Sequence, residues 1–521
     1  MIPKEVNSLA EIYHQKTKYF REEIANKPRQ LDWSSQPAPF KDYHSERKID
    51  LIPYLPFQKN PFTGKPLEYP PFGQEEDLGL GNISRLLYFT NGVTGILQYP
   101  NGSKLYLRAA PTAGGLYPTE IYLAVRDIPH LENGIYNFQV RDHTLIPLWE
   151  GNFWSEFSQY CFGHEAIQQS KLVVIMTAVF WRSAWRYEDR AYRRILLDTG
   201  HVLGNLNCYA QKEGLGVYPI SGFFDQALNR LLFLEEDKEG VLMMNALPLL
   251  KTLKAREIRR SSVYPSTLKW PETDQNTPLL LSLHQTSYLG PEDFVFEGEL
   301  PDAGSNKDKY LNSASITMEG NSLDLEEKGI EQTILERRST RSYSGQPLFK
   351  DELADLLKFA YEPAILKDEG ESENRGLPQV FDPTLLETFV IVHGVLELDS
   401  GVYYYSTIRQ ELRLIRKGNF KQNSWEFCLG QELGRDAAVI VVHASHLPNA
   451  VSKYGNRAYR YLHLDAGHIG QRINLAAIQM GLGASGIGGF FDDEVNDLLH
   501  LSLEYAIVYI TTIGRPAAVS G

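Results

Sequence analysis

Residues 187–207 read YEDRAYRRILLDTGHVLGNLN, and residues 454–474 read YGNRAYRYLHLDAGHIGQRIN. Their shared positions lie 267 residues apart: Tyr187, Arg190, Tyr192, Asp198, Gly200, His201 and Asn207 in the first stretch, and Tyr454, Arg457, Tyr459, Asp465, Gly467, His468 and Asn474 in the second. The same offset relates residues 134–136 (GIY) to 401–403 (GVY), and residues 222–224 to 489–491 (both GFF). One offset kept over this span indicates an internal duplication, so two copies of one unit decide the fold.

Each copy contains the same order of helix and strand patterns. Continuous apolar runs at residues 172–180 and 437–445 predict buried strands, and residues 505–514 predict a closing strand. Near-helical apolar spacing predicts a long helix over 192–213 and again over 459–480, each ending at a Gly-Leu-Gly stretch that can close it. The two element types do not alternate strictly as βαβ units, so the predicted class is α+β.

The duplication and the composition together predict four regions. A chain of 521 residues exceeds what one hydrophobic core usually supports. We expect an N-terminal helix and extended arm over 1–74, a first repeat over 75–262, an exposed polar linker over 263–325, and a second repeat over 326–521.

Composition limits the partners of this chain. Its formal net charge of −13 argues against nucleic acid, because that binding depends on Lys and Arg neutralising phosphates. No stretch approaches the roughly 18 apolar residues needed to span a bilayer, and no signal peptide opens the chain, so we expect a cytoplasmic protein that does not bind membrane. The three cysteines are widely spaced, so no metal site is expected.

A basic cluster opens the second repeat and is a candidate phosphate site. Arg337, Arg338, Ser339 and Arg341 lie within five residues, just before a predicted helix that starts near Lys350. Arg guanidinium groups remain charged and bind phosphate through planar pairs of donors. Composition alone also allows a solvated basic turn.

The pattern R-R-S-x-R-x-[FY] resembles the opening of FMN-dependent nitroreductase-superfamily domains, in which mainly antiparallel sheets are flanked by helices. The resemblance implies that Arg337, Arg338, Ser339 and Arg341 hold the flavin phosphate, and that Arg515 adds a second phosphate contact. It also implies that the main chain of Gly486, Ile487, Gly488 and Gly489 passes close to the flavin ring, where a Cβ would hold the backbone away from a flat ligand.

A second motif lies in the first repeat. Residues 108–118 (RAAPTAGGLYP) closely resemble the R-x-x-P-S-A-G-A-L-Y-P signature of the SagB-type thiazoline/oxazoline dehydrogenase branch. The resemblance implies a loop that lines the flavin ring across a subunit boundary, made of Pro111, Thr112, Ala113, Gly114, Gly115 and Leu116. Thr112 replaces the usual Ser, and Gly115 replaces the usual Ala, which keeps the loop small.

The two repeats divide these motifs between them. The first has the ring-lining loop but no RRSxR, and the second has RRSxR but reads FDPTLLE (residues 381–387) where the loop would be. We therefore expect a pseudo-dimer with one FMN per chain, at the pseudo-twofold interface between the copies. If the chain forms a homodimer, the same residues could instead meet between chains.

Candidate catalytic residues come from the same resemblance. Residues 453–459 (KYGNRAY) match the K-Y-x-x-R-x-Y pattern of the SagB-type branch, which implies catalytic roles for Lys453 and Tyr454. Free Lys and Tyr have pKa values near 10, so a base would need its pKa lowered by burial or by a neighbouring charge. The alternative is a surface Lys beside a packed Tyr. Both repeats retain the DxGH histidines, His201 and His468, which favours a structural role for them.

The tandem form looks most like the cyanobactin oxidases. That resemblance implies FMN, an azoline-containing peptide substrate that is oxidised to an azole, and molecular oxygen as electron acceptor. An NAD(P)H-dependent nitro- or quinone reductase is a second hypothesis. A non-catalytic peptide-binding scaffold is a third.

Overall fold

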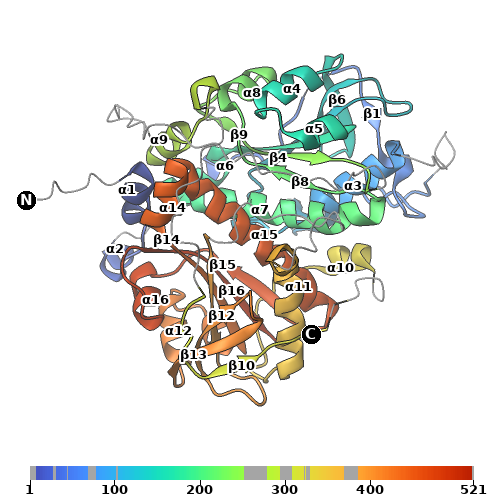
Figure 1. The fold of residues 1–521 in the computed structure, drawn as a ribbon. Coiled ribbons are helices and arrows are strands. Elements are labelled where there is room, and N and C mark those ends of the chain that lie inside the picture. Colours follow the sequence, from blue (N-terminus) through green and yellow to red (C-terminus); the bar gives the residue numbers. More distant parts are fainter. Residues whose placement is uncertain are drawn as a thin grey trace, which may run out of the picture.

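The computed structural model describes residues 8–26, 31–43, 45–67, 78–100, 102, 104–250, 278–293, 308–321, 323, 329–368 and 385–518. Within these residues the chain forms two α+β halves, related by the duplication, as the sequence predicts. Figure 1 shows the first half in blue to green and the second in yellow to red, with the long helices α7 and α15 between their sheets.

Two seven-stranded antiparallel sheets have the same strand order. The first runs β1-β6-β5-β4-β7-β9-β8, and the second runs β10-β13-β12-β11-β14-β16-β15. The first sheet comprises β1 (Ile49–Asp50), β4 (Thr119–Val125), β5 (Gly134–Gln139), β6 (Thr144–Glu150), β7 (Leu172–Val179), β8 (Tyr218–Ile220) and β9 (Glu239–Leu247). The second comprises β10 (Ser315–Thr317), β11 (Glu387–Val392), β12 (Gly401–Ser406), β13 (Glu411–Lys417), β14 (Val439–His446), β15 (Gly483–Ile487) and β16 (Tyr505–Gly514). A separate hairpin pairs β2 (Val93–Gln98) with β3 (Lys104–Arg108).

Helices cover both faces of each sheet. The first half contains α1 (Leu9–Lys16), α2 (Arg21–Asn26), α3 (Leu80–Asn91), α4 (Trp154–Tyr160), α5 (Glu165–Gln169), α6 (Phe180–Tyr187), α7 (Ala191–Ala210) and α8 (Asp225–Leu231). The rest of the chain contains α9 (Leu279–Thr286), α10 (Ile330–Glu336), α11 (Lys350–Asp368), α12 (Lys421–Phe427), α13 (Glu432–Asp436), α14 (Leu447–Tyr454), α15 (Ala458–Gln479) and α16 (Asp492–Leu498). Because both faces are covered, every residue of the central strands β4 and β11 is buried.

The repeated helices α7 and α15 pack against each other at the centre of the molecule (Figure 1). Every residue of α7 is buried, and one continuous hydrophobic core runs through both halves. The helices touch at Gly200 and Gly467, which are equivalent positions of the two copies. A Cβ on Gly467 would lie 2.3 Å from the Leu197 carbonyl oxygen and 3.0 Å from the Gly200 Cα. Glycine is therefore required where the two copies meet.

Reciprocal ion pairs join the halves near these helices. Arg190 and Arg193 bind the buried carboxylate of Asp492, at N–O distances of 3.0 and 2.6 Å. Arg457 and Arg460 bind Asp225 in the same way, at 2.6 and 2.8 Å. Each copy thus holds a buried carboxylate of the other. Breaking such a pair is costly because it leaves a buried charge uncompensated.

The region predicted as an exposed linker, residues 263–325, differs from that expectation where the structure describes it. Its Leu-rich segment forms α9, in which Leu280, Leu283 and His284 are buried. Residues 315–317 form β10, which pairs with β13 at the edge of the second sheet. The apolar side chains of residues 279–283 explain the difference, because removing apolar surface from water is favourable. Residues 263–277, 294–307, 322, 324 and 325 of this region lie outside the described part of the chain.

Candidate active site

The Arg/Ser cluster lies against the edge strand β15 of the second half. Thr340 N–H donates to the Ala484 carbonyl at 3.0 Å, and a Cβ on Gly483 would lie 2.2 Å from Thr340 Oγ1. Gly483 therefore allows the segment to lie flat on the strand. Arg338 and Arg341 are exposed beyond this contact, and Ser339 is half-buried. The exposed guanidinium groups remain accessible to an anion.

Arg337 differs from the other cationic residues of the cluster. Its side chain is buried, and it donates to the main-chain carbonyls of Ala109 and Arg108 at 2.9 and 3.0 Å. Burial lowers its pKa to about 10, so the guanidinium stays charged at neutral pH. Arg337 therefore joins the second-half cluster to the stretch that leads into the first-half loop.

Arg515, expected to add a phosphate contact, pairs with a carboxylate. Its Nη2 lies 2.9 and 3.0 Å from the two carboxylate oxygens of Glu352, and its Nε donates to the Pro347 carbonyl. Ser344 N–H donates to the Arg515 carbonyl at 2.9 Å, which keeps this residue beside the Arg/Ser cluster. A phosphate would have to compete with Glu352 for this guanidinium.

The loop Pro111–Leu116 is held by Asp198 of α7. Thr112 Oγ1 donates to the Asp198 carboxylate at 2.5 Å, and Ala113 N–H donates to it at 3.1 Å. Burial raises the pKa of Asp198 to about 7, although these hydrogen bonds and Arg194 act to lower it. Gly114 and Gly115 have φ angles of +69° and +72°, which favour glycine. Leu116 is buried and anchors the end of the loop.

The glycine segment after β15 approaches first-half residues across the interface. A Cβ on Gly488 would lie 3.2 Å from Arg194 Nε. Arg194, on α7, has its guanidinium carbon 3.7 Å from the ring centroid of Tyr187. A Cβ on Gly114 would in turn lie 2.7 Å from the Tyr187 hydroxyl. The Gly488 main chain, the ring-lining loop and the pair Tyr187–Arg194 therefore meet at one place.

Gly486 has a reason to be glycine that the sequence did not indicate. Its Cβ would lie 1.8 Å from the Tyr509 hydroxyl, which pairs with His201 Nε2 at 2.8 Å. His201 Nδ1 also pairs with Gln471 Oε1 at 2.9 Å, and burial lowers the pKa of this histidine to about 4. His468 is likewise buried, pairs with Asn207, and has a pKa lowered to about 3. Both histidines are neutral groups of the interface, with side-chain partners.

Lys453 and Tyr454 lie on the other side of the pseudo-twofold axis. The Tyr454 ring packs edge-on against Tyr461 at 5.4 Å between centroids, and the Tyr461 hydroxyl lies 3.3 Å from the Ser221 carbonyl. Tyr461 and Ser221 are the duplicates of Arg194 and Gly488. Lys453 and Tyr454 are likewise the duplicates of Arg186 and Tyr187. They therefore lie at the equivalent place across the axis, whereas Arg186 and Tyr187 lie beside the loop. The prediction that Lys453 and Tyr454 act at the cofactor stays a prediction, and this placement does not favour it.

Sequence reasoning missed Tyr187, Arg194 and Tyr19 at this site. Tyr19 lies between α1 and α2, with Arg190 above its ring at 4.1 Å and Arg194 Nη2 3.5 Å from its hydroxyl. Position 194 differs between the copies, Arg194 against Tyr461, while the surrounding motif is retained. That difference is the sequence signal that could have identified Arg194. Tyr19 lies outside the repeats, so no difference between the copies could have identified it.

These residues fit a flat, phosphorylated cofactor. Exposed Gly486 and half-buried Gly488 and Gly489 present main chain without side chains, and exposed Arg338 and Arg341 lie on the same strand edge. Arg194 Nη1 is a buried donor with no hydrogen-bond partner among the described residues, which points to an acceptor on a bound molecule. Within the same residues, no cluster of His, Cys, Asp and Glu could hold a metal ion, and no helix is long and apolar enough to cross a membrane.

Comparison with known proteins identifies both halves. The model of the nitroreductase family matches residues 80–247 and 334–515, which is more than half of the chain. A crystal structure of a "putative nitroreductase" from Anabaena variabilis ATCC 29413 is 41% identical, with a TM-score of 0.85, over 98% of this chain and 100% of that one.

Curated relatives match one half at a time. A protein of Methanocaldococcus jannaschii named "Putative nitroreductase" is 30% identical over 38% of this chain and 97% of its own length. The trifolitoxin operon protein TfxC of Rhizobium leguminosarum is 27% identical over 33% of this chain and 50% of its length. The microcin B17-processing protein McbC of Escherichia coli is 24% identical over 25% of this chain and 49% of its length.

Proposed function

The chain belongs to the nitroreductase family, and on that premise we propose that it is an FMN-dependent oxidase that converts thiazolines, and oxazolines, of a modified peptide to thiazoles and oxazoles. One observation carries the proposal. The first-half loop Pro111–Leu116 and the second-half glycine segment meet at Tyr187 and Arg194, beside the Arg/Ser cluster. The loop sequence is the part of the chain that resembles azoline dehydrogenases.

Two relatives support a peptide as the substrate. McbC is named for the processing of microcin B17, and TfxC belongs to the trifolitoxin operon. The McbC name concerns processing of a microcin, and both proteins match only part of this chain. The cytoplasm is the proposed compartment.

FMN would be held by residues from both halves. Arg338, Ser339 and Arg341 would bind the phosphate. Arg515 would also bind the phosphate if its guanidinium released Glu352. The main chain of Gly486–Gly489 and the loop Pro111–Leu116 would lie against the two sides of the ring. When bound, the flavin supplies the hydride acceptor, and molecular oxygen is the proposed final oxidant.

Azoline oxidation removes a proton and a hydride from adjacent ring carbons, so the protein must also accept a proton. Tyr187 and Arg194 are among the polar side chains that α6 and α7 bring to this place, together with Arg186 and Asp198. Asp198 fixes the loop that would exclude water from the ring. Lys453 and Tyr454 remain proposed alternatives from the sequence resemblance.

Mass spectrometry of a thiazoline-containing peptide incubated with the purified yellow protein in air tests this function. We expect the peptide to lose two hydrogens per ring and hydrogen peroxide to accumulate. The variant Arg341→Ala, which should lose its flavin, is the control for a bound cofactor. An unchanged peptide mass with fully flavin-loaded protein would contradict the proposal.

The family name favours one alternative, an NAD(P)H-dependent nitro- or quinone reductase. Rapid mixing with NADPH in the absence of oxygen separates the two. Fast bleaching of the flavin would favour the reductase, whereas bleaching only by the azoline peptide would favour the oxidase.

A further inference from the structure

Tyr19 is brought to the candidate active site by the N-terminal arm. A Cβ on Gly489 would lie 3.7 Å from Tyr19 Cε2, so the tyrosine ring lies beside the glycine segment. Arg194 Nη2 lies 3.5 Å from the Tyr19 hydroxyl, and the guanidinium carbon of Arg190 lies 4.1 Å from the ring centroid. Tyr19 is half-buried, so one side of it remains accessible. A residue far from the repeats thus reaches the place where the two halves meet.

Contacts on both sides of Tyr19 fix its position. On one side, the Thr17 carbonyl accepts from Arg190 at 2.5 Å, and Lys18 pairs with Asp493 at 2.7 Å. On the other side, Arg21 pairs with Glu426 at 2.9 Å and with Glu494 at 2.5 Å. The arm is therefore attached before and after Tyr19 to α7 and to the second half.

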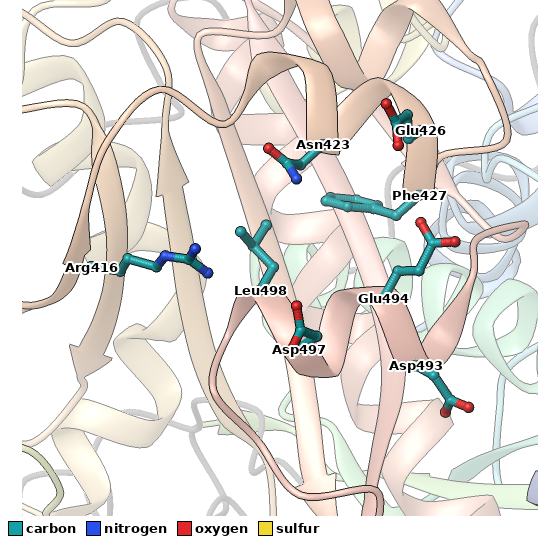
Figure 2. Close-up of a pocket in the computed structure, with 8 residues that line it drawn as sticks. All are labelled: Arg416, Asn423, Glu426, Phe427, Asp493, Glu494, Asp497 and Leu498. Carbon is teal, nitrogen blue, oxygen red and sulfur yellow. The ribbon is translucent and has the colours of Figure 1, made fainter.

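The attachment of Arg21 uses one edge of an acidic pocket between α12 and α16. This pocket has a volume of about 390 Å³, and Arg416, Asn423, Glu426, Phe427, Asp493, Glu494, Asp497 and Leu498 line it. Figure 2 shows Glu426 on α12 and Glu494 on α16, the two carboxylates that bind Arg21. We assign the pocket edge to anchoring the arm.

The duplication supplies an internal comparison for the arginines around Tyr19. In the second copy, Arg457 Nε and Nη2 donate to the Ser221 carbonyl, and Nη1 binds Asp225. At the equivalent Arg190, Nε and Nη2 are buried without a hydrogen-bond partner among the described residues, and so is Arg194 Nη1. Buried polar groups are normally paired. Arg190 therefore has spare donors that its duplicate Arg457 does not have, and on the second side Arg460 Nε is the arginine nitrogen left without a partner among the described residues.

The charges around Tyr19 favour its phenolate. Burial acts to raise its pKa, but Arg194, Arg190 and Arg193 outweigh burial, and the pKa is lowered from its usual range. The neighbouring Tyr187 behaves in the opposite way, because burial raises its pKa above the usual range. Other charged groups close to this place include Asp492, which pairs with Arg190 and Arg193, and Asp493, which pairs with Lys18. Arg186 and Asp198 lie near Tyr187. Of these two tyrosines, Tyr19 is better placed to accept a proton.

We propose that Tyr19 is the proton acceptor of the azoline oxidation, with Arg190 and Arg194 stabilising its phenolate. This inference rests on the proposed function. The phenolate oxygen forms an O–H bond with the proton of one ring carbon as that C–H bond breaks. The flavin, when bound, would accept the hydride of the adjacent carbon with its electron pair, and the C=C bond formed between these two carbons would complete the aromatic ring. The proton then returns from Tyr19 to water.

The first test is single-turnover bleaching of the flavin by a synthetic thiazoline peptide without oxygen. We expect Tyr19→Phe to stay folded and yellow but to react at least roughly 100-fold more slowly, because a lost acid–base group costs about that much or more. The exposed Tyr99→Phe is the matched control for removal of one phenol. A Tyr19→Phe rate equal to that of the wild type would overturn the inference.

The second test does not depend on activity. The ultraviolet tyrosinate absorbance of the wild type minus that of Tyr19→Phe reports the titration of this residue alone. We expect it to ionise below the ordinary value of about 10, and Arg194→Gln to move both this titration and the rise of the bleaching rate to higher pH. Ionisation at or above the ordinary value would overturn the inference. If the wild type does not react with azolines, the proposed function fails, and this titration still decides whether Tyr19 forms a phenolate.

Discussion

At the scale of single residues, Asp198 connects a long helix to the ring-lining loop. Its carboxyl accepts from Thr112 and Ala113, and burial raises its pKa to about 7. The equivalent position of the second copy, Asp465, is also Asp, but the duplicate of the loop lies outside the described residues. This retained carboxyl therefore holds the loop Pro111–Leu116 in the first copy.

Asp198 gives a pH dependence with a definite sign. Because its folded pKa of about 7 lies above the ordinary value, the folded state binds its proton more tightly than the unfolded state. The contribution of Asp198 to the unfolding free energy is fully present below about pH 4. It is lost as pH rises to about 7, by an amount on the order of 4 kcal/mol.

We expect Asp198→Asn to remove this dependence, measured as the difference in unfolding free energy between wild type and variant across pH 4–8. Thr112→Ser keeps the hydroxyl and is the control. A difference that stays constant with pH would contradict the assignment.

Tyr187 and Tyr454 are a matched pair for locating the cofactor. Tyr187 lies against Gly114 of the loop, whereas Tyr454 packs against Tyr461 on the other side of the axis. We expect Tyr187→Phe to shift the visible flavin spectrum and Tyr454→Phe to leave it unchanged. The reverse result would place the flavin beside Lys453 and support the catalytic prediction made from the sequence.

At the scale of elements, the contact between α7 and α15 depends on two glycines. A Cβ on Gly467 would lie 2.3 Å from the Leu197 carbonyl, so Gly467→Ala requires movement of a backbone and not of a flexible side chain. We expect a loss of at least about 2 kcal/mol in unfolding free energy, measured by denaturant titration. Gly81→Ala in α3 is the control, because only the end of the Arg85 side chain lies near. Equal unfolding free energies for the two variants would show that α7 and α15 can move apart without loss of stability.

The sequence predicted these elements well because apolar periodicity is local. The predicted helices over 192–213 and 459–480 correspond to α7 and α15, and the predicted closing strand corresponds to β16. Gly214 and Gly481 have φ angles of +70°, the left-handed conformation expected at helix ends. The segment 279–286 was missed as a helix because a polar, Pro-dotted environment surrounds its short apolar run.

The site was harder to predict because its contacts cross between the copies. Motifs identified the loop and the Arg/Ser cluster, and Arg337 reaches the carbonyls of Arg108 and Ala109. The catalytic roles expected for Lys453 and Tyr454 stay predictions, and the motif alone did not indicate which copy of it faces the loop. The residues that face the loop come from the same copy as the loop, so Tyr187 lies there and Tyr454 does not. No linear pattern encodes the position of Tyr19.

At the scale of the whole molecule, the chain is a fused pair in which the two equivalent places have diverged. One has the loop, Tyr187, Arg194 and the Arg/Ser cluster, with guanidinium donors that find no partner in the described part of the chain. The other has Tyr454 and Tyr461, and its Arg457 is bound by Ser221, Asp225 and Ser287. Because the duplicate of Arg190 is satisfied by protein groups, we expect no second ligand at that arginine.

This divergence predicts one FMN per 521-residue chain. Flavin released from denatured protein and measured by absorbance should give a ratio near one, and Arg338→Ala or Arg341→Ala should weaken binding about ten- to a hundredfold, because a hydrogen bond to a charged group contributes about 1.5–3 kcal/mol. Arg435→Ala removes an exposed guanidinium that pairs with Asp436 and serves as the control. A ratio near two would show that both places bind the cofactor. A ratio near one that neither variant lowers would show that the cofactor lies on the other side of the axis.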